Sequence, residues 1–324
     1  MSDPPSAPTG KSAPSPSGSP VLVSGATGFV GLPLIAELAR RGEQVHAIST
    51  RAQPPTVEGV RWHRVDLSNE IETRGLVEEL APGRFVHLAW YVEPGRFWDS
   101  PENVLWVERS LSLMRAFVAE GGRRAVMLGT CAEYDWSEAS DQPLSEARSP
   151  LLQNTLYGAA KDGLRRVGEA YAEQAGIELA WGRLFHLYGP REAPGRLVSS
   201  IVASLLAGET VETTTGEQRR DFMHVEDVAG ALVALLDSAV VGPVNIASGA
   251  GVKVSDVIDR LGRLTGGSRL LRRGALSERP GEPHSLVGDV ARLRDEVGYR
   301  PRWTLDDGLS DTVRWWERRL GIER

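Results

Sequence analysis

A regularly spaced set of glycines near the N-terminal end of the chain is the feature that most constrains its fold. Residues 21–23 are apolar, Gly25, Gly28 and Gly31 follow, and apolar residues then recur at helical spacing. A strand, a glycine turn and a helix in this order bring backbone N–H groups to the positive end of a helix, where a pyrophosphate binds. The turn predicts a dinucleotide site; a glycine-rich turn without a ligand is the alternative. The residues expected to contact the dinucleotide here are Gly25, Thr27, Gly28, Phe29, Val30 and Gly31.

Strands and helices alternate over residues 20–185. Apolar runs predict strands at 44–48, 60–65, 84–88, 125–129 and 178–184, and helical periodicity predicts helices at 76–80, 103–120 and 157–174. Parallel strands need crossover connections, which helices supply. We therefore predict an α/β fold, a Rossmann-type doubly wound parallel sheet, in a dinucleotide-binding domain of residues 20–185 that residues 223–248 complete.

The alternation weakens after Pro190. Helices are predicted at 197–206, 225–236, 254–264 and 309–318, with a short strand at 244–246. We expect residues 186–222 and 249–324 to form a smaller C-terminal α/β lobe that binds the substrate. The first twenty residues hold six Pro and six Ser, so residues 1–19 are predicted to be a disordered leader.

Composition excludes several classes of protein. The 37 Lys and Arg against 43 Asp and Glu give a formal net charge of -6, which argues against nucleic-acid binding. The single cysteine, Cys131, cannot form an internal disulfide, and no Cys/His run has zinc spacing, so we expect no metal and a cytoplasmic location. No apolar stretch reaches the roughly 18 residues of a membrane span.

The end of the second strand bears on the choice of cofactor. An acidic residue usually contacts the ribose of NAD there, whereas this chain has Thr50 and Arg51, which suit a 2′-phosphate. NADP(H) is therefore the favoured cofactor, and NAD(H) remains possible. The alternative for Arg51 is a solvated loop charge that contacts no cofactor. After the third strand, Asp66 and Leu67 are expected either beside the adenine or as a helix cap.

Tyr157 and Lys161 lie four residues apart and so share one face of a predicted helix. A fixed positive charge favours phenolate, which would lower the pKa of the tyrosine toward the range of a general acid or base. A surface pair without function is the alternative. Aromatic residues also follow the fourth strand at Trp90-Tyr91 and Phe97-Trp98, where they either wall a sugar pocket or pack in the core.

The sequence resembles the extended short-chain dehydrogenases/reductases that act on nucleotide-activated sugars, over residues 21–318. The motifs that carry the resemblance are the glycine turn, His87-Leu88-Ala89, Thr130-Cys-Ala-Glu-Tyr134, Tyr157/Lys161, Arg183-Leu-Phe-His-Leu-Tyr-Gly-Pro190, Gly216-Glu-Gln-Arg-Arg-Asp-Phe222 and Arg279-Pro-Gly-Glu282. Leu88 and Ala89 are then expected beside the dinucleotide.

This resemblance implies a catalytic triad and a set of substrate contacts. Tyr157 exchanges a proton with a sugar oxygen, and Thr130 hydrogen-bonds that sugar oxygen. Lys161 lowers the pKa of the tyrosine and holds the nicotinamide ribose. Cys131 takes the place of Thr130 if the alignment slips by one residue. Arg220 and Arg279 contact the nucleotide diphosphate. His186 stands where the family has an asparagine that binds the substrate phosphate, so it is either a substitute donor or a packed imidazole. Trp90 is expected at the sugar, and pairing through helices beginning at 103 and 157 would give a homodimer.

The residues after Thr130 separate the reactions of such relatives. Cys131 and Ala132 take the place of the two acidic-type residues of 4,6-dehydratases, and Glu133 would face the opposite side if the strand continued, so dehydration is disfavoured. Thr50 and Arg51 favour reduction. We predict NADPH-dependent reduction of the C4 ketone of a nucleotide-diphosphate (NDP) 4-keto-6-deoxyhexose. The alternatives are an NAD(P)-dependent NDP-sugar epimerase and a catalytically silent dinucleotide-binding sensor or scaffold, which would not need the Tyr157/Lys161 pair.

Overall fold

The computed structural model describes residues 19–137, 142–278 and 280–322. Most of the predicted leader, residues 1–18, and one predicted diphosphate contact, Arg279, lie outside the described residues. Ser19, the last residue of the predicted leader, accepts a hydrogen bond from the backbone N–H of Gly83 at 3.0 Å.

A parallel sheet of seven strands forms the larger part of the molecule, in the order β10-β6-β5-β4-β1-β2-β3. Its strands are β1 (Val21–Ser24), β2 (Val45–Ser49), β3 (Val60–Arg64), β4 (Arg84–His87), β5 (Arg124–Thr130), β6 (Glu178–Leu184) and β10 (Gly242–Ile246). Neighbouring strands pair parallel throughout, as in Val21 opposite Val45 and Arg84. The strand order reverses between β1 and β4, and ligands of such sheets bind at the carboxyl ends of the strands at this point.

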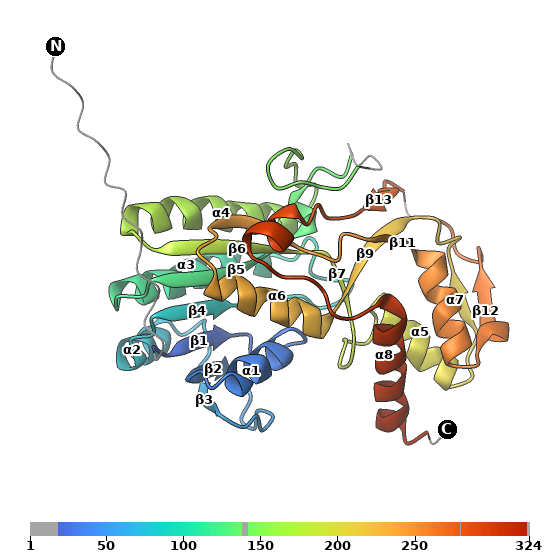
Figure 1. The fold of residues 1–324 in the computed structure, drawn as a ribbon, viewed down its shortest axis with the longest axis horizontal. Coiled ribbons are helices and arrows are strands. Elements are labelled where there is room, and N and C mark those ends of the chain that lie inside the picture. The colour runs from blue at the N-terminus through green and yellow to red at the C-terminus, as the bar shows by residue number, and fades with distance from the viewer. Residues whose placement is uncertain (1–18, 138–141, 279, 323–324) are drawn as a thin grey trace, which may run out of the picture.

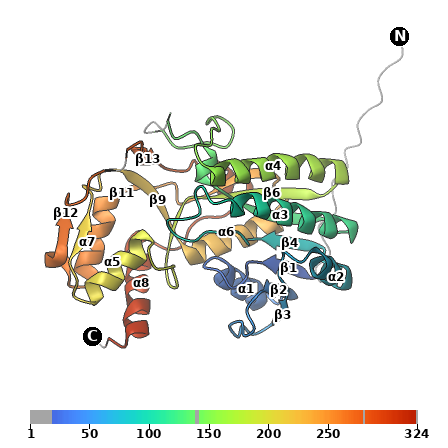
Figure 2. The same ribbon diagram turned by 180° about the vertical axis from the view of Figure 1, so that it is seen from behind.

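Helices cover both faces of this sheet (Figures 1 and 2). One face carries α1 (Gly31–Arg40) and α6 (Val225–Asp237), and the other carries α2 (Glu70–Leu80), α3 (Glu102–Ala119) and α4 (Leu156–Ala175). Because both faces are covered, β1, β2, β4 and β5 are buried along their whole length. The predicted α/β fold with a doubly wound parallel sheet is confirmed.

A smaller group of elements follows β6 in the chain. It contains β7 (His186–Tyr188), β8 (Val211–Thr213), β9 (Arg219–His224), β11 (Gly251–Lys253), β12 (Leu271–Arg273), β13 (Ser285–Leu286), α5 (Leu197–Leu206), α7 (Val254–Leu264) and α8 (Leu305–Leu320). The central strand β9 pairs with β7, β11 and β13, and β12 pairs with β8. The three helices share an apolar core that includes Val202, Val257 and Leu309. Figure 1 shows these elements beside the end of the large sheet.

Helix ends differ from the predicted ones where polar caps decide them. α2 begins at Glu70 rather than 76 because the Asn69 side chain accepts the N–H of Glu72 at 3.2 Å. α8 begins at Leu305 rather than 309, since Thr304 caps it through the N–H of Asp307. The remaining helical turns are 3-10 turns at Cys131–Glu133 and Ser268–Leu270 and a π-helical turn at Arg292–Glu296.

Candidate active site

A cleft of about 1760 Å³ extends from the carboxyl ends of the parallel strands to the smaller group of elements. The predicted site residues that line it are Gly25, Thr27, Gly28, Phe29, Val30, Gly31, Thr50, Asp66, Leu67, Leu88, Ala89, Trp90, Thr130, Tyr157, Lys161, His186 and Arg220. Arg51 is exposed and is not among the lining residues of the described chain. One continuous space thus joins the predicted cofactor and substrate residues.

The glycine turn fits a dinucleotide phosphate. Gly25 has φ of +68°, and a Cβ there would lie 2.6 Å from the backbone nitrogen of Ala89 on the neighbouring strand. A Cβ on Gly31 would overlap the carbonyl oxygen of Gly25. No side chain caps the first turn of α1, which starts at Gly31. In this turn the N–H of Leu32 donates to the carbonyl oxygen of Gly28 at 3.2 Å, and Pro33 has no N–H, so the backbone N–H of Gly31 is the group of this turn that an anion could meet. Only glycine allows this close approach of turn, helix and strand.

Thr50 and Asp66 follow β2 and β3 at the carboxyl edge of the sheet, and both line the cleft. Thr50 lines the cleft, while the backbone N–H of Arg51 donates to Ser49 Oγ at 3.1 Å. The carboxylate of Asp66 accepts the N–H of Ser68 at 2.9 Å, a bond that lowers the pKa of Asp66. The alternative role of Asp66 as a helix cap is wrong, because Asn69 caps α2.

Tyr157 lies at the start of α4 and is buried against aromatic rings. The ring centroids of Phe97 and Trp98 lie 4.9 Å and 5.8 Å from that of Tyr157, both in edge-on contacts. Burial raises the pKa of Tyr157 above its ordinary value, although a hydrogen-bonding interaction with the Thr130 side chain opposes the shift. The direction is opposite to the predicted one, because desolvation of the phenolate is the largest effect on the group.

Lys161 shares the cleft with Tyr157 but directs its ammonium elsewhere. Its Nζ donates to the carbonyl oxygen of Leu128 at 2.8 Å and lies 3.7 Å from the centroid of the Trp90 ring. Burial lowers the pKa of Lys161 to about 7, and the charge of Glu133 opposes that shift. Trp90 therefore contacts the predicted catalytic lysine, a role that its position in the sequence did not indicate.

After Thr130 the strand gives way to a turn that carries Glu133 into the core. β5 ends at Thr130, whose hydroxyl accepts the N–H of Ala132 at 3.2 Å, and a 3-10 turn follows. The extended continuation considered for Glu133 is therefore wrong. Glu133 is fully buried, with its carboxylate bound to Arg183 Nε at 2.7 Å and to Trp181 Nε1 at 2.9 Å. Cys131 lines the cleft as a buried thiol, since burial raises its pKa to about 12.

His186 on β7 and Arg220 on β9 both line the cleft. Arg220 donates to Glu282 at 2.7 Å rather than to the nearby Asp221 or Glu226. Asp221 instead accepts the backbone N–H groups of Ser248, Gly249 and Gly288. The buried Nδ1 of His186 has no hydrogen-bond partner in the described chain, and burial beside Arg220 lowers the pKa of His186 to about 3.

Glu192 and Arg196 are among the cleft residues that the sequence interpretation missed. Glu192 and Arg196 lie on the segment between β7 and α5, and both line the cleft. Only their position shortly after the Tyr188-Gly-Pro190 motif could have drawn attention to them, because no spacing rule links them to Tyr157 or Lys161.

Among residues 19–137, 142–278 and 280–322, no helix combines the length and apolar character needed to cross a bilayer. In the same part of the chain, no three side chains of His, Cys, Asp or Glu gather as a metal-ligand set.

The chain belongs to the NAD-dependent epimerase/dehydratase family, whose model matches residues 21–247. The family inferred from the sequence motifs is confirmed. Among curated relatives, a dTDP-4-dehydro-6-deoxy-D-allose reductase of Streptomyces is 28% identical over 318 residues, covering 92% of this chain and 96% of its own. UDP-glucuronic acid decarboxylase 1 of Xenopus tropicalis is 27% identical and covers 93% of this chain and 72% of its own.

A solved structure supports the same assignment. MoeE5 in complex with UDP-glucose and NAD is 31% identical and superposes with a TM-score of 0.79, covering 93% of this chain and 99% of its own. An epimerase of Methanothermobacter thermautotrophicus superposes with a TM-score of 0.85 at 22% identity, which shows the shared fold.

Proposed function

We propose that this protein reduces the C4 ketone of an NDP-4-keto-6-deoxyhexose with NADPH. The observation that carries the proposal is the buried phenol of Tyr157 in the cleft, beside Thr130. The phenol is protonated at neutral pH, which is the state that a proton donor to a ketone oxygen needs, and burial raises its pKa further. A relative named as a 4-ketosugar reductase covers nearly the whole chain.

Each group of the triad has a defined task in this reaction. The nicotinamide supplies a hydride when the dinucleotide is bound. Tyr157 donates its proton to the forming C4 alkoxide, Thr130 hydrogen-bonds the same oxygen, and the ammonium of Lys161 stabilises the tyrosinate that remains. The lobe of residues 186–222 and 249–324 holds the nucleotide, with Arg220 and Arg279 at the diphosphate and His186 at a phosphate oxygen.

The cleft favours reduction over elimination. Dehydration at C5 and C6 needs an acid and a base next to the catalytic threonine, and the residues there are Cys131 and Ala132. Glu133 cannot serve, because both of its oxygens are engaged by buried donors. The apolar wall of Phe97 and Trp98 suits a deoxygenated carbon such as the C6 methyl group.

The proposed preference for NADP rests on the end of β2. Thr50 lines the cleft there, and the residue directly after it is Arg51 rather than an acidic residue. An NAD(P)-dependent NDP-sugar epimerase is the second candidate, favoured by the position of Arg51 away from the cleft and by a 31% identical relative that binds NAD and UDP-glucose. Arg51→Ala tests the cofactor preference: we expect weaker NADPH binding with unchanged NADH binding, and equal effects on both would contradict a contact between Arg51 and the 2′-phosphate.

A direct test follows the oxidation of NADPH with purified NDP-4-keto-6-deoxyhexoses that differ in the nucleotide. We expect absorbance of the reduced nicotinamide to fall with at least one of them, and Tyr157→Phe to abolish turnover while binding NADPH as the wild type does. Inversion of the sugar without net consumption of cofactor would identify an epimerase. Dinucleotide binding with no change in any sugar would identify the silent sensor.

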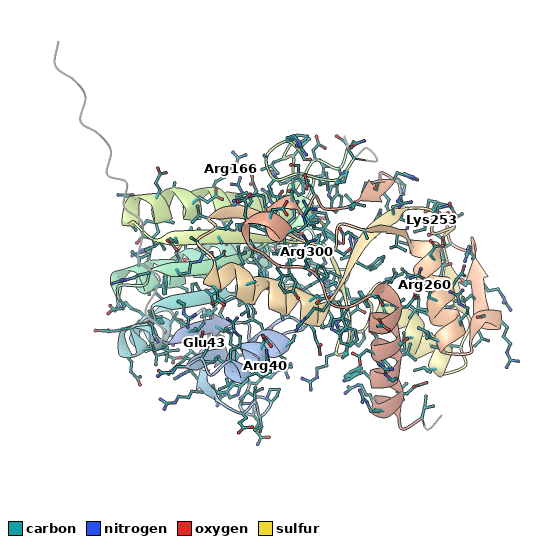
Figure 3. The ribbon with its side chains drawn as sticks, in the orientation of Figure 1. Arg40, Glu43, Arg166, Lys253, Arg260 and Arg300 are labelled. Carbon is teal, nitrogen blue, oxygen red and sulfur yellow. The ribbon has the colours of Figure 1, made fainter. Side chains whose placement is uncertain are left out.

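We also propose that the protein is a homodimer that pairs through α3 and α4. Val104 and Leu105 on α3 and Val167 on α4 are 57%, 41% and 52% exposed, which is high for large apolar side chains on two packed helices. Arg166, labelled in Figure 3, is an exposed residue of α4 beside Val167 in the chain, and it pairs with Asp162 at 2.9 Å. We expect Val167→Asp to halve the mass in light scattering, and Ile71→Asp, an exposed apolar position on α2, to leave it unchanged. A monomeric wild type would contradict the proposal.

A further inference from the structure

A buried carboxyl group lines the cleft at a place that neither the triad nor the diphosphate contacts use. Glu192 follows β7, precedes α5 and is only 6% exposed. The buried carboxyls of the described chain are Glu133, Asp135, Asp162, Glu192, Asp221 and Asp227. Of these, Glu192 is the one that lines the cleft. A buried acid facing a ligand space needs a polar partner, because burial without one is unfavourable.

The backbone turns sharply to place this side chain. Arg191, directly before Glu192, has φ of +71°, a left-handed conformation that residues with a Cβ rarely adopt. The N–H of Glu192 donates to the carbonyl oxygen of Gly189 across the turn, at 3.3 Å. Strained backbone of this kind persists where the surrounding structure fixes it, and it is common in ligand sites.

One oxygen of the carboxyl group is fixed and the other is not. Glu192 Oε2 accepts the backbone N–H of Ser199, in the first turn of α5, at 2.8 Å. The Ser199 side chain also interacts with the carboxyl group. Its hydroxyl donates to the carbonyl oxygens of Ala193 and Arg196 at 2.7 Å and 3.1 Å, so among the described residues Oε1 receives no hydrogen bond of its own. The side chain is thus held in one orientation with a free polar atom.

Arg196 connects Glu192 with the reacting end of the cleft. The Arg196 guanidinium lies 5.2 Å from the centroid of Phe97, which in turn packs against Tyr157. The charge of Arg196 lowers the pKa of both Tyr157 and Glu192, so it lies within electrostatic reach of the two groups. Glu192 therefore belongs to the sugar end of the cleft rather than to the adenine end.

We propose that Glu192 is a specificity-determining residue that donates a hydrogen bond from Oε1 to a hydroxyl oxygen of the hexose. This inference rests on the proposed function, since it assigns a partner to the sugar of the same substrate. The direction of the bond follows from the protonation state. Burial raises the pKa of Glu192 to about 8, against the opposing effects of the Ser199 N–H and of Arg196, the charged side chain that acts on it. Near neutrality the group is a neutral carboxylic acid with one O–H to donate.

Binding experiments test this without turnover. The probes are UDP-, dTDP- and CDP-glucose, each compared by calorimetry with its own diphosphate, and NADPH. The variants are Glu192→Leu, which removes the hydrogen bond, Glu192→Gln, which keeps a neutral donor, and Glu209→Gln, an exposed acid after α5 that does not line the cleft. The ratio of sugar-nucleotide to diphosphate affinity isolates the contribution of the sugar.

We expect Glu192→Leu to reduce that ratio about 2- to 12-fold, the value of one hydrogen bond, with diphosphate and NADPH affinities unchanged. Glu192→Gln and Glu209→Gln should keep the ratio. Above pH 8 the ratio should fall in the wild type but not in Glu192→Gln, a comparison that holds even if the leucine variant fails to fold. An unchanged ratio in Glu192→Leu, or equal pH profiles for wild type and Glu192→Gln, would overturn the assignment of Glu192 alone. Failure of the wild type to bind any of the three sugar nucleotides would overturn the proposed function as well.

Discussion

The Nζ of Lys161 lies 3.7 Å from the centroid of the Trp90 ring, in a cation–π contact inside the cleft. The indole is fixed by a hydrogen bond from Trp90 Nε1 to Asn103 Oδ1 at 2.9 Å, and the Asn103 amide donates to the carbonyl oxygen of Phe97 at 2.7 Å. The same asparagine therefore orders the ring beneath Lys161 and the loop that packs against Tyr157. Asn103 therefore links the surroundings of Lys161 with those of Tyr157, in addition to the four-residue spacing of the two side chains on α4.

Trp90→Leu should shift the pH dependence of activity. The leucine keeps apolar bulk but removes the π face that stabilises the ammonium, so the pKa of Lys161 should fall below its value of about 7. A cation–π contact of about 0.5–2 kcal/mol corresponds to a shift of roughly 0.4–1.5 pH units. If the ammonium is the active form, the alkaline fall of kcat/KM moves to lower pH. An unchanged alkaline limb would show that the contact does not influence Lys161.

Gly31→Ala should abolish dinucleotide binding. The new methyl group would overlap the carbonyl oxygen of Gly25, so the turn and the helix must separate. Gly75→Ala is the matched control, because a Cβ at this exposed position in α2 meets nothing within 4 Å. We expect the control to gain about 0.5–1 kcal/mol of stability and to bind NADPH normally. Fluorescence titration with NADPH and thermal melting measure both effects; tight binding by Gly31→Ala would contradict the role of the turn.

The buried pair of Glu133 and Arg183 should be essential for stability. Both side chains are at most 1% exposed, and the Nε of Arg183 donates to Glu133 at 2.7 Å. Arg183→Met leaves a carboxylate buried without its partner and should cost about 3–5 kcal/mol in urea unfolding. The double variant Glu133→Gln/Arg183→Met should recover part of this loss. If Arg183→Met costs less than about 1 kcal/mol, the pair does not hold the 3-10 turn that follows Thr130.

The free energy of unfolding should fall as pH decreases below about 6.5. Burial lowers the pKa of His87 and of His186 to about 3, so both stay neutral in the folded protein at pH values where the unfolded chain binds protons. Each adds a slope of up to about 1.4 kcal/mol per pH unit between these two pKa values. Urea titrations at several pH values measure how steeply the free energy of unfolding changes with pH. His186→Phe should reduce this slope by the contribution of one titrating histidine. A stability independent of pH over this range would contradict the buried neutral state.

The fold could be predicted because its signals are local. The apolar runs of β1 and β4, the glycine turn and the four-residue spacing of Tyr157 and Lys161 are legible without knowledge of distant contacts. The resemblance to a known family supplied the rest of the expected triad and led to Arg220, which lines the cleft.

The environment of the site could not be predicted, because it depends on contacts far apart in sequence. The partner of Arg220 is Glu282, 62 residues away, and Glu133 meets Arg183 across 50 residues. The raised pKa of Tyr157 results from the packing of the Phe97–Trp98 loop, whose position no periodicity determines. Glu192 is turned into the cleft by an arginine at positive φ, a conformation that sequence patterns assign to glycine.

Transfer of deuterium tests the proposed reaction most directly. NADPH carrying deuterium at the transferable position of the nicotinamide is incubated with the enzyme and an NDP-4-keto-6-deoxyhexose, and the product is examined by NMR. We predict one deuterium at C4 of the sugar, one NADP formed for each product molecule, and neither in Tyr157→Phe. An altered sugar without deuterium at C4, or a ketosugar that stays unchanged while NADPH is bound, would contradict a 4-ketoreductase.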